Sequence, residues 1–230
     1  MQLSPDSIIF WEHGFIRLNG TIIFTWLVMA LLCLVSRLVT RRLETNDKPS
    51  RRQNLLESIV VGILGQIEEV TQRKPDRFFP FLGTLFIFIA VSNLLSIIPG
   101  FQSPTGSLST TTALALCVMI AVPAYGISEN GLVNYLKNYI KPTPLMLPFN
   151  ITGEISRTLA MAVRLFGNIM SGSMIGGILL AIAPIFVPVI MQLLGLLTGL
   201  VQAYIFGILA AVYIAAGIQV QERSDGPSAD

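Results

Sequence analysis

Arg164 carries a charge in a part of the chain that is otherwise suited to hydrocarbon. It follows Arg157 by seven residues, and no further acidic or basic residue comes before Glu222. A guanidinium near the middle of a bilayer costs from about 3 kcal/mol on insertion scales to more than about 10 kcal/mol in simulations. Such a charge needs a polar cavity or a negative partner. Because the chain has few acids at that depth, we expect the partner to belong to another chain.

The residues around Arg164 predict a polar, closely packed helix face. Seven residues advance a helix by two turns less about 20°, so Arg157, Arg164 and Ser171 share one face. Asn168 lies one turn beyond Arg164, and Ala160 lies one turn before it. Small residues, which let another helix approach closely, crowd the same region: Gly167, Gly172, Ser173, Gly176 and Gly177. The glycines alone are equally typical of internal helix packing, but that alternative does not explain Arg164.

A second polar set lies in the last apolar segment. Gln202 and Tyr213 are eleven residues apart and share a helix face, and Gly195 and Gly199 precede Gln202 on its side. A glutamine in a membrane helix often serves only to bond one helix to another. Opposite an arginine-bearing helix, across a proline-marked turn, Gln202 is expected to be a neighbour of Arg164.

Composition identifies the class of protein that positions these residues. The 230 residues are 53% hydrophobic and 12% charged, whereas soluble domains carry about 25% charged residues. The chain is therefore predicted to be an all-α integral membrane protein forming a single domain. The N-terminus lacks the basic start of a signal peptide. No metal cluster, nucleophile triad or phosphate-binding loop is evident, so no metal, cofactor or nucleic acid is expected.

Apolar runs predict five membrane spans and one surface helix. The two final spans exceed 30 residues, which at about 1.5 Å per residue is much longer than a hydrocarbon core of about 30 Å, so both are expected to tilt strongly as a hairpin. An amphipathic helix is expected on the membrane surface or packed on the protein itself. The predicted ranges are an external segment 1–20, spans 21–39, 77–98, 110–127, 149–183 and 189–220, the amphipathic helix 53–73, and a polar tail 221–230.

The basic residues predict the orientation. Segments 37–52, 73–77 and 137–141 hold eleven Lys or Arg residues, whereas loops 99–109 and 184–188 hold none. Basic loops face the cytoplasm. The N-terminus is therefore expected outside and the C-terminus inside a bacterial plasma membrane.

Four motifs resemble subunit a of the F-type rotary ATP synthase. They are Arg164-Leu-Phe-Gly-Asn168, Leu200-Val-Gln202-Ala-Tyr-Ile-Phe206, Ser92-Asn-Leu-Leu-Ser-Ile-Ile-Pro99 and Leu147-Pro-Phe-Asn-Ile-Thr-Gly-Glu154. The resemblance covers nearly the whole chain. It implies a non-catalytic stator subunit, with ATP chemistry on other subunits, whose long helices face a rotating ring of c subunits. It also implies peripheral-stalk b subunits and other synthase subunits as partners in the bilayer.

The resemblance assigns Arg164 to the ion path. Each ring subunit carries one membrane carboxylate, and Arg164 would face it between two half-channels, favouring its ionised form and blocking leakage. Asn168 and Gln202 match positions that flank the arginine, and Tyr213 matches a further polar position. Glu154 matches an acidic position near the cytoplasmic start of the helix, where lining the inner half-channel and simple surface pairing with Arg157 are both open. Ala160, Gly167, Gly195 and Gly199 are expected to pack toward the ring.

This sequence departs from the family pattern in the outer half-channel. Ser173 and Gly195 stand where many members have acids or histidines, so hydroxyls such as Ser171 and Ser173, amides and water would have to carry the ion. A proton is the first expectation and sodium the second. The departure resembles the divergent, N-type branch of the family. The alternatives are a stand-alone transporter that binds an anionic substrate through Arg164, or a membrane anchor with a packing arginine, but the chain shows no inverted repeat.

Overall fold

The computed structural model describes residues 9–13, 16–40, 51–71, 77–98, 100–132, 146–182 and 187–219. Within these ranges the all-helical membrane architecture is confirmed. A small antiparallel hairpin before the first helix was not predicted. In chain order the elements are β1 (Ile9–His13), β2 (Ile16–Asn19), α1 (Gly20–Thr40), α2 (Arg51–Thr71), α3 (Phe79–Leu95), η3 (Pro104–Gly106), α4 (Leu108–Asn130), α6 (Met146–Ile182) and α7 (Val187–Gln219).

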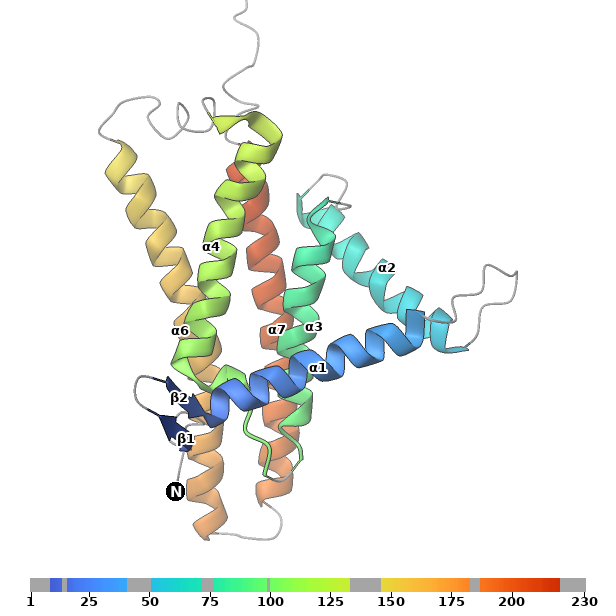
Figure 1. Cartoon of the computed structure of the whole chain (residues 1–230), viewed down its shortest axis with the longest axis vertical. Coiled ribbons are helices and arrows are strands. Elements are labelled where there is room, and N and C mark those ends of the chain that lie inside the picture. The colour runs from blue at the N-terminus through green and yellow to red at the C-terminus, as the bar shows by residue number, and fades with distance from the viewer. Residues whose placement is uncertain are drawn as a thin grey trace, which may run out of the picture.

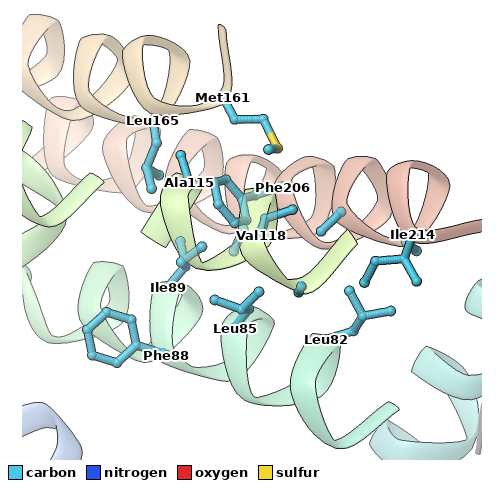
Figure 2. Packing of buried hydrophobic residues seen from close by; sticks show 14 of the residues in the cluster. Leu82, Leu85, Phe88, Ile89, Ala115, Val118, Met161, Leu165, Phe206 and Ile214 are labelled. Atoms are coloured by element: carbon cyan, nitrogen blue, oxygen red, sulfur yellow. The ribbon is translucent and has the colours of Figure 1, made fainter. Parts of the chain in front are cut away.

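Helices α3, α4, α6 and α7 form one bundle (Figure 1). Helix α7 contacts each of the other three. The α6–α7 hairpin lies at one end of the bundle, and the end of α4 and the start of α6 lie at the other, while α1 crosses the bundle obliquely. The core between the helices is apolar, as Figure 2 shows for Leu82, Ile89, Val118, Leu165 and Phe206. The arginine helix and the glutamine helix are therefore held by packing within this chain.

Four helices in the described ranges are long and apolar enough to cross a membrane, and α3 is a shorter apolar helix. With 17 residues, α3 is about 26 Å long and stands at the lower limit for a span. It is shorter than the predicted 77–98 because Pro80 lies in its first turn and the chain turns after Leu95. Gly100 then adopts φ +93°, which glycine accepts without strain.

The two last helices match the expectation of a long hairpin. Helix α6 has 37 residues and α7 has 33, so each is roughly 50 Å long and exceeds the thickness of the hydrocarbon core. The two helices contact each other. The predicted polar tail and most of the basic residues that carry the orientation lie outside the described residues.

Helix α2 is the expected amphipathic segment, for which a place on the membrane surface and packing on the protein itself were both open. Glu57, Glu68 and Glu69 are exposed, whereas Ile67 is buried and Ile63 packs against the bundle core. The helix contacts α7 and α3. Part of its apolar side therefore rests on this protein and not on lipid.

Candidate functional site

Arg164 lies on the exposed side of α6. Arg157, Ala160 and Ser171 are exposed as well, as the shared helix face predicts, while Leu165 points into the core. Within the part of the chain that the structure describes, the Arg164 side chain forms no hydrogen bond or ion pair. A guanidinium is a strong donor that is costly to leave without a partner in an apolar medium. Its placement therefore suits a partner that approaches from outside the fold.

Two amide side chains bond α7 to α6 and to α3, near the level of Arg164 along the bundle. Asn168 Nδ2 of α6 donates to the carbonyl oxygen of Thr198 at 3.2 Å. Asn93 Nδ2 of α3 donates to the carbonyl oxygen of Gly199 at 2.8 Å. These carbonyls are adjacent in the chain, and both lie about one turn before Gln202. Asn168, predicted as a site residue, thus joins the arginine helix to the glutamine helix.

Asn93 belongs to a buried polar network that sequence reasoning did not single out. Thr105 Oγ1 donates to Asn93 Oδ1 at 3.1 Å, and the hydroxyls of Ser103 and Thr105 are 2.6 Å apart. Asn93, Thr105 and Ser103 are all buried. The available signal was the amide of Asn93 inside the largely apolar span 77–98, where it forms part of one of the four motifs.

A cavity of about 680 Å³, with a mostly apolar lining that includes several polar side chains, opens between the α3–η3 connection and the hairpin halves of α6 and α7. It begins one turn beyond Arg164, at Asn168. None of the described side chains that line it carries a charge, and their polar groups are hydroxyls and amides. The polar lining residues are Asn93, Ser96, Gln102, Ser103, Asn168, Ser171, Ser173, Gln192 and Thr198, with Gly172, Gly176, Gly177, Gly195 and Gly199 among the small ones.

The predicted hydroxyls lie at this cavity. Ser171 and Ser173 are exposed on α6, and their hydroxyls donate to the backbone carbonyls of Asn168 and Met170 at 3.2 and 2.8 Å. Each oxygen keeps its lone pairs for a further donor. Both hydroxyls can therefore still accept a hydrogen bond from a group in the cavity.

The structure separates the environments of Gln202 and Arg164. Gln202 is buried within the bundle at 6% exposure, whereas Arg164 is exposed. Their direct proximity stays a prediction.

The four small residues expected to face the ring also differ in their surroundings. A Cβ on Gly167 or Gly195 would meet nothing within 4 Å, and Ala160 is exposed. A Cβ on Gly199 would lie 3.0 Å from Asn93 Cβ. The structure therefore places Gly199 against α3, on an internal contact and not on the exposed side.

A charged cluster lies toward the other end of α6. The guanidinium of Arg157 lies over the Tyr213 ring, 5.4 Å from its centroid, and Arg157 acts electrostatically on the half-buried Glu154. The contact to Tyr213 was not anticipated. It brings Glu154 and Arg157 of α6 close to Tyr213 of α7. This cluster precedes Arg164 along α6, whereas the cavity follows it.

The sequence matches the family model described as "ATP synthase A chain" over residues 22–215. The chain belongs to the ATP synthase subunit a family. It is 59% identical to ATP synthase subunit a of Nitrosospira multiformis, over all of this chain and 92% of that protein. It is 60% identical to subunit a of Albidiferax ferrireducens, over 99% of this chain and 98% of the relative.

A third relative, ATP synthase subunit a 2 of Acaryochloris marina, is 61% identical over 97% of this chain and 96% of its own length. Family membership confirms the resemblance drawn from the motifs. It makes the chain a multi-pass, non-catalytic subunit of the ATP synthase membrane sector, working with other subunits of that complex. The two alternatives, a stand-alone transporter and a plain anchor, are thereby set aside.

Proposed function

We propose that this subunit forms the stationary half of the ion path of an ATP synthase, with Arg164 as the charge that separates two half-channels. The observation that carries the proposal is Arg164 itself. It is exposed on the membrane helix α6, one turn from the cavity, and has no bonding partner among the described residues. A cation placed in this way fits a negative group on a neighbouring subunit.

The negative group would be the membrane carboxylate of a rotating c-ring subunit. Facing Arg164, the carboxylate is favoured in its ionised form and releases its ion. The same fixed charge repels a cation that would otherwise pass directly between the half-channels. Arginine suits this role because it keeps its proton when it is partly desolvated.

The uncharged cavity would be the outer half-channel. Its lining includes the hairpin halves of α6 and α7. The hairpin lies at one end of the bundle (Figure 1), and the basic-residue rule predicts that this end faces away from the cytoplasm. The hydroxyls, amides and backbone carbonyls of the cavity can hold water but do not titrate near neutral pH. We propose proton transport as the first candidate. Sodium is the second, because none of the described side chains that line the cavity titrates near neutral pH.

The inner half-channel would open near Glu154, Arg157 and Tyr213. These residues lie at the other end of α6 and α7 from the cavity. In this orientation the N-terminus is outside and the C-terminus is cytoplasmic. The exposed sides of α6 and α7 would face the c-ring, and the peripheral-stalk b subunits would bind elsewhere on the subunit.

ATP-driven ion uptake by the reconstituted complex, with and without sodium and at several pH values, tests the proposal. We expect uptake in the wild-type complex and none with Arg164→Ala at equal assembly. Uptake of protons in sodium-free buffer would identify the proton as the ion. Uptake only with sodium would favour the second candidate, and normal coupled uptake by Arg164→Ala would contradict the role of the arginine.

A further inference from the structure

Two neighbouring carbonyls of α7 are each bonded by a side-chain amide from a different helix. Asn168 reaches Thr198 from α6, and Asn93 reaches Gly199 from α3. Both carbonyls lie inside α7 and also take part in its backbone hydrogen bonding, so each amide adds a second hydrogen bond from outside the helix. We propose that Asn93 is a positioning residue that sets the depth and rotation of α7 against α3.

Asn93 packs closely against the backbone of α7 at Gly199. A Cβ on Gly199 would lie 3.0 Å from both Cβ and Cγ of Asn93, so only glycine leaves room for this approach. Asn93 itself is 2% exposed. A buried amide without partners is strongly disfavoured, so a slide or rotation of α7 that breaks the bond to Gly199 carries a cost.

Thr105 fixes the orientation of the amide. Its hydroxyl donates to Asn93 Oδ1 at 3.1 Å, which leaves Nδ2 directed at Gly199. Thr105 is fully buried and bonded to Ser103 in turn. The η3 turn, which precedes α4, therefore determines which atom of Asn93 faces α7.

The position of this contact gives it a functional consequence. Gly199 lies three residues before Gln202, and Asn93, Asn168, Thr198 and Gly199 all line the same cavity. Moving α7 would displace Gln202 relative to the arginine helix and change the end of the cavity next to Arg164. This consequence rests on the proposed function, whereas the positioning itself does not.

Disulfide cross-linking between α3 and α7 tests the positioning directly. A Cβ on Gly207 would lie 3.7 Å from Phe86 Cβ, within the range that a disulfide requires. Cysteines at both positions, in a chain whose free and exposed Cys33 and Cys117 are changed to serine, should therefore cross-link readily in membranes that hold the assembled complex. A parent pair that fails to cross-link would overturn the packing on which the proposal rests.

The test variant is Asn93→Leu, which keeps the number and branching of the side-chain heavy atoms and removes both hydrogen bonds. We expect the initial cross-linking rate to fall about fivefold, in line with the loss of a buried hydrogen bond. Thr105→Val, which leaves Asn93 in place but frees its amide, should give a fall of about twofold. The matched control is Thr84→Ala, because Thr84 is exposed on α3 and bonds only within its own helix, to the Pro80 carbonyl. Its rate should equal that of the parent.

An unchanged rate in Asn93→Leu would overturn the proposal. If that variant does not accumulate, Thr105→Val decides in the same way, because an unchanged rate there would mean that the orientation of Asn93 does not matter. ATP-driven ion uptake is measured on the same membranes. A slower cross-link with normal uptake would leave the positioning role standing and contradict only its link to ion transport.

Discussion

The guanidinium carbon of Arg157 lies 5.4 Å from the centroid of the Tyr213 ring. The two longest helices are thus joined by a cation–π contact that precedes Arg164 along α6, whereas the cavity follows it. Asn168 joins the same helices at the cavity. Arg164 is therefore flanked along α6 by two polar links to α7. These two links fix the rotation of α6 against α7 and so keep Arg164 on the exposed side of α6.

The aromatic ring at position 213 is expected to matter for the stability of this pairing. Tyr213→Leu removes the cation–π contact, which at an exposed arginine contributes about 0.5–1 kcal/mol. Tyr213→Phe keeps the ring and should retain most of that stability. Thermal dissociation of the solubilised complex measures both variants, and equal stability of the Leu and Phe variants would show that the contact contributes nothing.

Glycines 199 and 195 lie one turn apart on α7 and provide a matched pair. Gly199→Ala places a Cβ 3.0 Å from Asn93 and is expected to destabilise the subunit by about 1–3 kcal/mol, as overpacking does. Gly195→Ala meets nothing within 4 Å in this chain and should be neutral or slightly stabilising, since alanine favours helix. Thermal unfolding of the isolated subunit in detergent checks the pair. Equal effects would mean that the α3–α7 approach at Gly199 is looser than described.

Removal of the charge at Arg164 is expected to abolish coupled transport without loss of the fold. The side chain is exposed and bonds to none of the described residues, so Arg164→Ala leaves no buried group without a partner. We expect normal amounts of assembled complex and no ATP-driven ion uptake. A variant that failed to assemble would instead assign the arginine a structural role.

Gln202→Leu should impair transport less severely than Arg164→Ala. Gln202 is buried at 6% exposure, and leucine is similar in size, so the fold should tolerate the change while a polar group near the cavity is lost. We expect ion uptake to fall by roughly tenfold, comparable to the loss of one hydrogen bond to a charged or polar partner. The rate of ATP-driven uptake, normalised to assembled complex, is the measurement. Complete loss of uptake would mean that Gln202 ranks with the arginine.

Much of the fold could be predicted from the chain because the bilayer limits the choices. Long apolar runs must become helices there, since every backbone group has to be bonded within its own segment. Helices α6 and α7 accordingly begin and end within about three residues of the predicted ranges 149–183 and 189–220. The β1–β2 hairpin was missed because short strands next to a membrane helix leave no distinct apolar pattern.

The candidate site divides in the same way. Arg164 was predictable because a lone charge among apolar residues stands out in the sequence. The motifs around it resemble those of the family, and they too can be recognised from the order of residues alone. Asn93 was not, because its significance depends on Gly199, more than one hundred residues away, and on Thr105 in a turn. The internal contact of Gly199 was likewise invisible to helical periodicity, which gives faces but not neighbours.

The membrane class, the lengths of the two final helices and the charge on the proposed ion path follow from the order of residues alone, because they depend on local composition and on the cost of a charge in lipid. The folded chain adds which side of each helix faces inward, that Gln202 is buried while Arg164 is exposed, and that a cavity without described charged side chains begins beside Asn168. Packing and hydrogen bonding between distant segments select one relative rotation of the helices, and no single segment encodes that rotation.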